Sequence, residues 1–252
     1  MGSDKHKKIK EAVKKRYSEF AEKGTSCCPT CNYDVTEQAK KIGYSEKELE
    51  QLPKEAVMGL GCGNPTALAE LREGETVLDL GAGAGIDVFL AAKRVGPKGY
   101  VIGVDMTETM IEKANKTVQR DGYKNVEFRL GEIEKLPVKD NSIDVIISNC
   151  VINLSPDKLR TYQEAYRVLK PGGRMLISDL VTKGKLPDRI KKNFDAWAAC
   201  IGGAMEKNEY LRIIKKAGFT KVDIAAEHTY IEPGLDKALA GKIMSVQIRA
   251  YK

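Results

Sequence analysis

Cysteines are the residues of this chain that are best suited to chemistry, because a thiolate is both a nucleophile and a ligand for soft ions. The six cysteines are Cys27, Cys28, Cys31, Cys62, Cys150 and Cys200. Cys62 has the most unusual surroundings, since it lies between two glycines in the stretch GLGCGNP at residues 59–65. An ordinary turn with a small apolar side chain would explain this stretch. The functional interpretation is that Cys62 belongs to a set of cysteines that meet around one soft atom.

The cysteine spacing bears on redox state and on metal binding. In a reducing cytosol the cysteines are expected to be free thiols, so any disulfide would be transient and catalytic. Residues 28–31 form one Cys-x-x-Cys motif, but no second motif follows, and the chain has two histidines. A closed zinc site is therefore poorly supported. His6 and His228 are interpreted as solvated or structural rather than catalytic.

The composition is that of a soluble globular protein. The chain has 252 residues, of which 42% are hydrophobic and 31% charged, and its net charge is +7. No apolar run approaches the roughly 18 residues that a membrane span needs, and the basic N-terminus lacks the apolar region of a secretory signal. We therefore expect a cytoplasmic protein without a membrane partner. The basic residues of segment 1–23 fit a nucleic-acid site, but the solvated face of a helix is the preferred interpretation.

The central part of the chain alternates between strands and helices. Strands are expected at 76–81, 100–105, 125–130, 142–148 and 171–180, and helices at 86–95, 107–122 and 156–169, the last with Ser155 as N-cap. Before them, we expect an amphipathic helix over 7–23, an irregular stretch over 27–45 and a short helix over 46–52. After them, we expect a polar, then helical segment over 183–206, a helix over 208–217, and two edge strands over 221–230 and 245–252.

This order of elements indicates an α/β fold, a doubly wound Rossmann-like sheet of seven strands with helices on both faces. Three regions are expected. Residues 1–65 form an N-terminal helical extension with cysteine-bearing loops, and residues 66–182 form the nucleotide-binding core. Residues 183–252 form a lid insert followed by the last helix and strands of the sheet.

The first turn between a strand and a helix, residues 79–85, reads Asp-Leu-Gly-Ala-Gly-Ala-Gly. Its glycines allow a tight turn and a close approach of the backbone to a ligand, which in such sheets binds at the carboxyl ends of the strands. Asp105 ends the second strand, where a carboxylate can bind both ribose hydroxyls. An NAD site would usually read Gly-x-Gly-x-x-Gly, whereas this turn reads Gly-x-Gly-x-Gly, with Asp79 two residues before the first glycine.

Four segments between about residues 70 and 180, VLDLGAGAG, GVDMT, GEIEKLPV and VLKPGGRMLISD, together resemble the class I S-adenosylmethionine-dependent methyltransferases. The resemblance implies that S-adenosylmethionine is the cofactor. It also implies a set of cofactor-binding residues: Asp79, Gly81, Gly83 and Gly85 under the methionine and ribose, Asp105 on the ribose hydroxyls, Met106 stacked on the adenine, Glu132 and Ile133 at the adenine edge, and Asn149 beside the methionine.

The residues that follow the fourth strand bear on what is methylated. Many enzymes that methylate nucleic-acid bases carry Asn-Pro-Pro-Tyr here, whereas this chain has SNCVINL at 148–154, without a proline pair or an aromatic residue to stack a flipped base. Nucleic acid is therefore not the expected partner. Cys150 lies on this segment, Cys200 on the insert, and Cys62 on the loop before the core. Thiolates that converge from separate segments suit a small thiophilic acceptor, such as trivalent arsenic, which keeps a lone pair for attack on the methyl group.

The segments GLGCGNP, ISNCVINL and ACIGGA, with a Cys-Cys pair on the N-terminal extension, resemble the arsenite S-adenosylmethionine methyltransferases. The resemblance implies that Cys150 and Cys200 bind As(III) directly and that Cys62 and an N-terminal cysteine complete the thiol set. It implies a transient disulfide between Cys62 and an N-terminal cysteine, with Cys28 favoured over Cys27 and Cys31. It further implies a thiol reductant, glutathione or a thioredoxin-like partner, as co-substrate.

Three other functions remain open at the level of sequence. A small-molecule C- or O-methyltransferase of the quinone or sterol kind would have very similar core motifs, but no reason to place cysteines in its loops and lid. A thiol-based metalloid-binding protein would bind the metalloid without turnover. An RNA methyltransferase is the least favoured of the three.

Overall fold

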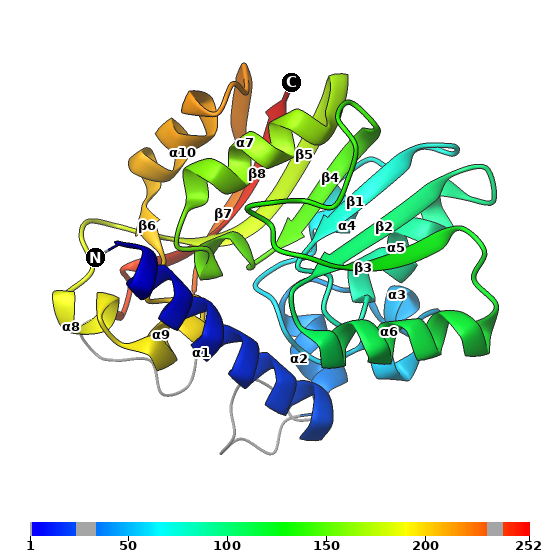
Figure 1. Ribbon diagram of the computed structural model, residues 1–252, viewed down its shortest axis with the longest axis horizontal. Helices are drawn as coiled ribbons and strands as arrows, with labels where there is room; N and C mark the ends of the chain where they lie inside the picture. The colour runs from blue at the N-terminus through cyan, green and yellow to red at the C-terminus, as the bar shows by residue number, and fades with distance from the viewer. Residues whose placement is uncertain (1, 24–33, 231–238) are drawn as a thin grey trace.

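The computed structural model describes residues 2–23, 34–230 and 239–252, which surround one twisted sheet (Figure 1). Among these residues, eight strands join in the order β3-β2-β1-β4-β5-β8-β7, with β6 paired to β5. The strands are β1 (Thr76–Leu80), β2 (Tyr100–Asp105), β3 (Val126–Leu130), β4 (Ile143–Asn149), β5 (Leu169–Thr182), β6 (Met205–Glu206), β7 (Lys221–Thr229) and β8 (Ile243–Tyr251). The first five are parallel, whereas β8 runs antiparallel to β5 and β7. The predicted α/β fold is confirmed, and the short β6 adds to the seven strands expected.

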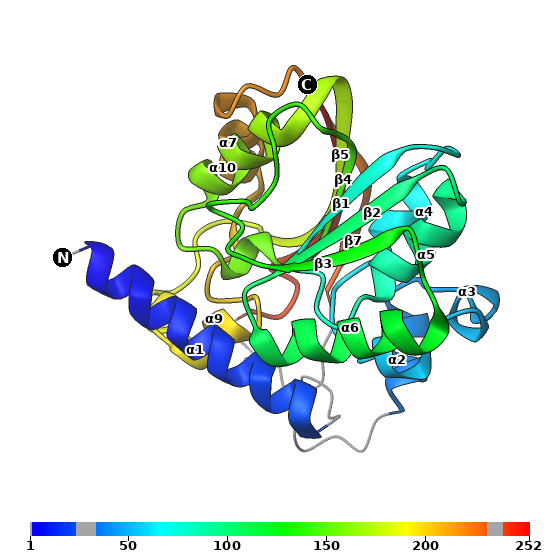
Figure 2. The same ribbon diagram turned by 45° about the vertical axis from the view of Figure 1, so that its right-hand side comes forward.

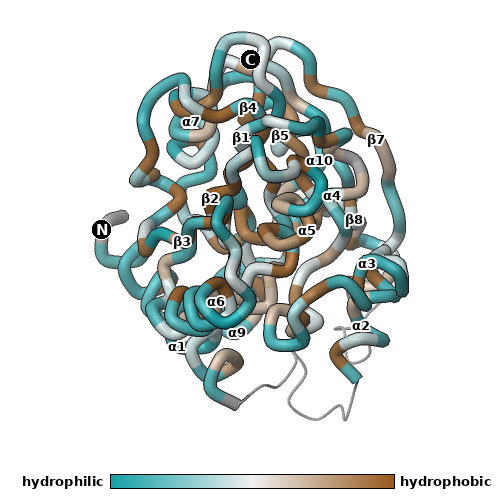
Figure 3. Tube along the Cα trace, turned by 90° about the vertical axis from the view of Figure 1, so that its right-hand side faces the viewer, coloured by the Kyte–Doolittle hydropathy of each residue, from teal (hydrophilic) through white to brown (hydrophobic). Residues whose placement is uncertain are grey.

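Helices cover both faces of the sheet, as predicted. One face carries α7 (Lys158–Val168) and α10 (Lys207–Lys216), and the other carries α5 (Ile86–Val95) and α6 (Glu108–Asp121). Successive strand residues point to opposite faces, so Val77 joins the core layer of α5 while Leu78 joins that of α7. Figure 3 shows hydrophobic residues in the middle of the molecule and hydrophilic residues on the outer turns of α6.

The remaining helices are short, apart from the first. They are α1 (Gly2–Lys23), α2 (Val35–Lys41), α3 (Glu46–Glu50), η1 (Lys54–Ala56), α4 (Pro65–Leu68), η2 (Ile152–Leu154), α8 (Asp188–Lys191) and α9 (Phe194–Ala198). The prediction of an irregular stretch over 27–45 was wrong for α2. Asp34 caps this helix by accepting the N–H of Thr36 at 2.8 Å, and Ala39 is fully buried, so packing stabilises a helix too short to persist alone.

The predicted start of α7 was also wrong. The helix begins at Lys158, and its N-cap is Asp157, whose carboxylate accepts the N–H of Arg160 at 3.0 Å. Ser155 instead donates its hydroxyl to Glu134 at 2.7 Å. Aspartate and serine are comparably good N-caps, so the local sequence did not distinguish them.

The N-terminal helix α1 packs against α6 and α9 across the open end of the fold (Figures 1 and 2). Its apolar side chains Ile9 and Val13 are each 1% exposed. Lys10 forms ion pairs with Glu132 and Glu134, at 2.8 and 3.1 Å. Helix α1 therefore covers the carboxyl ends of the strands. Among the described helices, none combines the length and the apolar character needed to span a bilayer.

Candidate active site

A cavity lined by most of the predicted cofactor residues, here named the main cavity, lies at the carboxyl ends of β1, β2 and β4, beneath α1. It is lined by seven of the predicted cofactor residues, namely Asp79, Gly81, Gly83, Asp105, Met106, Ile133 and Asn149. Cys150 lines the same cavity, and Val13 and Tyr17 of α1 close it on one side. Two predicted residues lie elsewhere: Gly85 is packed into the core behind the turn, and Glu132 faces Lys10 in a neighbouring groove.

The turn between β1 and α5 requires its glycines for different reasons. Gly81 has φ +68°, and a Cβ there would lie 2.3 Å from Val151. Gly85 has φ +99°, and a Cβ there would lie 2.7 Å from Phe128. Gly83 has φ +53°, but a Cβ there would meet no described heavy atom within 4 Å, because it would enter the cavity. The first and third glycines are thus needed for packing, while the middle one leaves space for a ligand.

Asp105 is fixed by the backbone around the cavity. Its carboxylate accepts the N–H of Gly83 at 2.9 Å and that of Thr107 at 2.8 Å. Burial raises the pKa of Asp105, and the two backbone hydrogen bonds oppose this. A carboxylate offers about four lone-pair directions, so Asp105 can also accept from a ligand hydroxyl. Met106 and Ile133 form an apolar wall nearby, which suits the flat ring of a nucleoside.

Two further carboxylates, Asp79 and Asp87, are buried at the base of the cavity. Asp87 accepts the hydroxyl of Tyr44 at 2.9 Å and that of Thr66 at 2.6 Å. Burial and the nearby charges of Asp87 and Asp105 raise the pKa of Asp79 well above its ordinary value. A cationic ligand group at this position would relieve the repulsion. Asp87 and Tyr44 were missed from the sequence, because neither belongs to the glycine-rich motif.

Asn149 holds the loop that carries Cys62. Its side chain accepts the N–H of Cys62 at 3.0 Å and donates to the carbonyl of Gly63 at 2.7 Å. A Cβ on Gly61 would lie 2.8 Å from the Asn149 amide, and one on Gly63 would lie 2.7 Å from Ser178. The glycines that flank Cys62 therefore allow the loop to pack closely against β4 and β5, a role that the sequence alone did not suggest.

The thiols of Cys62, Cys150 and Cys200 gather in one buried cluster beside the cavity. Cys150 and Cys200 have φ values of +60° and +63°, which are uncommon for residues other than glycine and often mark functional positions. The Cys200 thiol donates to the carbonyl of Cys150 at 3.0 Å, and the Tyr17 hydroxyl lies 3.9 Å from the Cys200 sulfur. Cys28, the predicted disulfide partner, lies outside the described residues.

Burial keeps these thiols protonated at neutral pH. It raises the pKa of Cys62. The contact with Cys150 and burial raise the pKa of Cys200 well above its ordinary value. Cys200 lowers the pKa of Cys150, but Cys62 and burial outweigh it, so that pKa is also raised. The cluster is thus better suited to covalent bonds that leave the sulfur atoms uncharged than to holding free thiolates.

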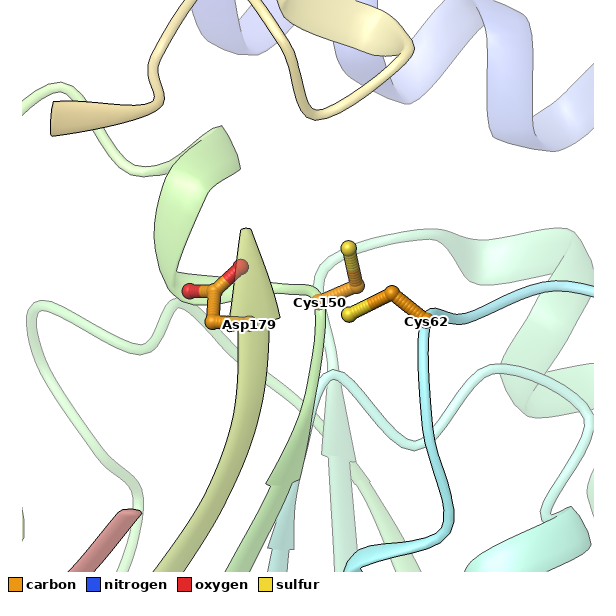
Figure 4. Close-up of side chains that lie close together, drawn as sticks. All are labelled: Cys62, Cys150 and Asp179. Carbon is orange, nitrogen blue, oxygen red and sulfur yellow. The ribbon is translucent and has the colours of Figure 1, made fainter. Parts of the chain in front are cut away.

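Asp179 and Lys158 add buried charge beside the thiols. A carboxylate oxygen of Asp179 and the sulfurs of Cys62 and Cys150 all lie within 4.8 Å of one another (Figure 4). Burial raises the pKa of Asp179 to about 6 and lowers that of Lys158 to about 8. Asp179 was missed as a site residue, although its place at the carboxyl end of a predicted central strand was an available signal.

The comparisons with known proteins agree with this geometry. Residues 71–218 match the family model described as a methyltransferase domain, so the chain belongs to that family. It is 42% identical to the arsenite methyltransferase of Halobacterium salinarum, over 96% of this chain and 66% of the relative. It is also 42% identical to the human arsenite methyltransferase, over 63% of this chain and 44% of the relative, so it spans about two thirds or less of these curated relatives.

One solved structure is similar to this protein over most of the length of both chains. It is the arsenic(III) S-adenosylmethionine methyltransferase of Chlamydomonas reinhardtii, with a TM-score of 0.69 and 36% identity. The match covers 88% of this chain and 75% of that one.

Proposed function

We propose that this protein transfers a methyl group from S-adenosylmethionine to trivalent arsenic bound by cysteine thiolates. The observation that carries the proposal is the convergence of three buried thiols, from three separate segments, beside the main cavity. Cys150 belongs both to this cluster and to the cavity lining, so it adjoins both reactants. The names of the similar proteins support the same substrate.

The residues around the cavity fit S-adenosylmethionine. Asp105 has free lone pairs for the ribose hydroxyls, Gly83 leaves room for the ligand, and Asp79 offers a carboxylate to the amino group. Met106 and Ile133 would lie against the adenine. When bound, the cofactor supplies an electrophilic methyl group on its sulfonium. Glu132 and Glu134 both pair with Lys10, but Glu134 lines this cavity and Glu132 does not.

The protonation state of the thiols suits the binding of arsenite. Arsenous acid and three thiols combine to give a neutral tris-thiolate and three molecules of water, so no charge needs to be buried. The raised pKa values of Cys62, Cys150 and Cys200 are therefore compatible with binding, although they oppose free thiolates. The lone pair on arsenic would then attack the methyl carbon while the methyl–sulfur bond breaks and S-adenosylhomocysteine leaves, so the protein has to position the reactants rather than supply a general base.

The electrons for continued turnover are proposed to come from cysteines. Methyl transfer raises arsenic formally from +3 to +5, and two electrons return it to +3. Oxidation of two thiols to one disulfide releases two electrons and two protons. We assign this disulfide to Cys62 and Cys28, to be reduced again by glutathione or a thioredoxin-like protein, both of which are available in the cytoplasm.

The decisive experiment measures methylated arsenic after incubation of the protein with arsenite, S-adenosylmethionine and excess thiol. We expect Cys200→Ser to abolish the product while cofactor binding persists, because Cys200 does not line the cavity. Thr117→Ser is the matched control, since it also changes a buried small side chain but lies in α6, away from the thiols. Methylation of a quinone or sterol acceptor in place of arsenite would contradict the proposal, as would arsenite binding without turnover.

A further inference from the structure

Asp179 has no task in the proposed transfer, because arsenic(III) is satisfied by three thiolates. Asp179 nevertheless lies near the carboxyl end of β5, three residues before its last residue, and is 0% exposed. In Figure 4 the sulfur of Cys62 points toward this carboxylate from the opposite loop. One oxygen of Asp179 and the sulfurs of Cys62 and Cys150 lie within 4.8 Å of one another. Distances of this size allow one ion to contact all three atoms after a small closure.

We propose that Cys62, Cys150 and Asp179 form a binding site for a divalent, thiophilic cation of the zinc(II) class, which competes with arsenite for the thiols. Zinc(II) prefers four tetrahedral ligands drawn from thiolate, imidazole and carboxylate. The three side chains supply three of them. The thiol of Cys200, or a small molecule entering through the main cavity, would supply the fourth.

Hydrogen bonds around the carboxylate orient it for this role. One oxygen of Asp179 accepts from the amide of Asn153 at 2.8 Å and from the N–H of Leu180 at 2.9 Å. The other accepts the hydroxyl of Tyr210 at 2.7 Å. Such outer partners commonly fix the ligands of metal sites. The Cys62 backbone is held in a comparable way by Asn149, at 3.0 Å.

The charges also distinguish a divalent cation from arsenic. A divalent cation on two thiolates and one carboxylate carries a net charge of −1, with the two thiol protons released to solvent. The buried ammonium of Lys158, which attracts Asp179, offsets this charge. Arsenic on three thiolates is neutral and needs no carboxylate. Asp179 should therefore matter more for the cation than for arsenite.

The test titrates the reduced full chain with Co²⁺, whose thiolate complexes absorb in the near ultraviolet. Cys27, Cys28 and Cys31 are first replaced by serine, so that this cluster does not contribute. We expect one Co²⁺ per chain, a signal lost in Cys150→Ser, and an affinity reduced about 10- to 100-fold in Asp179→Asn. Arsenite affinity should fall far less in Asp179→Asn. Asp157→Asn is the matched control, because asparagine also caps a helix.

Two outcomes would overturn the proposal. The first is the absence of a cobalt signal once Cys27, Cys28 and Cys31 have been replaced by serine. The second is an X-ray absorption spectrum of the zinc complex that shows sulfur ligands but no oxygen ligand. The second measurement uses the parent chain and does not depend on how Asp179→Asn folds. Competition with arsenite rests on the proposed function, whereas cation binding does not. A chain that binds Co²⁺ but never methylates arsenite would refute the proposed function alone.

Discussion

Lys158 holds its ammonium group between two backbone carbonyls and an aromatic ring. It donates to the carbonyls of Ser155 and Asn153 at 3.1 and 3.4 Å, and lies 5.3 Å from the centre of the Trp197 ring. Burial lowers its pKa from 10.5 to about 8, although Asp179 and Cys200 attract the charge. The folded protein therefore binds this proton less tightly than the unfolded chain does.

The sign of the pH effect follows from that difference. Above pH 8 the folded state loses the proton while the unfolded chain keeps it, so stability rises with pH. Relative to Lys158→Met, the free energy of unfolding of the parent should increase by about 2 kcal/mol between about pH 7 and about pH 9.5. Urea denaturation at both pH values measures this increase. Lys116→Met, on the exposed side of α6, controls for the loss of a positive charge; an equal change there would refute the assignment.

The residues of the site differ in how far sequence could identify them. Cys62, Cys150 and Cys200 could be chosen by residue type and by their place on separate loops. Asp179 had only its place near the carboxyl end of a strand as a signal, and Lys158 had none, because a lysine at a helix start is common. Burial gives these two residues their unusual chemistry, and burial depends on the packing of distant segments.

At the scale of the element, the glycines of the turn between β1 and α5 serve different purposes, since some are needed for folding and one leaves room for a ligand. Gly83 has φ +53° and room for a Cβ, and so has Gly122 at the end of α6, with φ +70°. Alanine at either position would therefore have to adopt the same unfavourable left-handed backbone conformation. They differ in that Gly83 lines the main cavity and Gly122 does not.

This matched pair makes a prediction about cofactor binding. Gly83→Ala and Gly122→Ala should each cost about 1–2 kcal/mol of stability, because a left-handed residue then carries a Cβ. Only Gly83→Ala should weaken S-adenosylmethionine binding, measured by calorimetry, since its methyl group enters the cavity. Equal cofactor affinity in the two variants would show that the cofactor lies elsewhere.

At the scale of the whole molecule, α1 joins the cofactor cavity to the thiol cluster. Val13 and Tyr17 line the cavity, and Tyr17 also reaches Cys200. Ion pairs from Lys10 to Glu132 and Glu134 fasten the helix to the core. A single helix therefore covers both the cavity and the thiol cluster, and shielding from water strengthens electrostatic interactions there.

Loosening α1 should consequently weaken cofactor binding without unfolding the sheet. Ile9→Ala removes a 1% exposed side chain and should cost about 2–4 kcal/mol of local stability. Hydrogen exchange should become faster in α1 but not in β1 or β4, and cofactor dissociation should become faster. The same substitution at the exposed Ile224 of β7 is the control. Faster exchange throughout the sheet would mean that α1 is part of the global folding unit.

The sequence by itself determined the architecture, because short-range patterns encode it. The alternation of apolar strands with amphipathic helices predicted β2 (Tyr100–Asp105) and α5 (Ile86–Val95) at their observed bounds. The glycine-rich turn with Asp105 predicted a nucleotide site, and the six cysteines predicted soft chemistry. These signals are carried by residue type and local spacing, which do not depend on the rest of the chain.

The tertiary structure decided how the site is assembled. It brought Asp179 beside two thiols, buried Lys158, and used Asn149 to hold the Cys62 loop. It also turned Glu132 toward Lys10 and placed Ser155 outside the N-cap of α7. Each outcome depends on contacts between segments far apart in the chain, and on the low dielectric constant that burial creates. Both the contacts and the low dielectric constant exist only once the chain has folded.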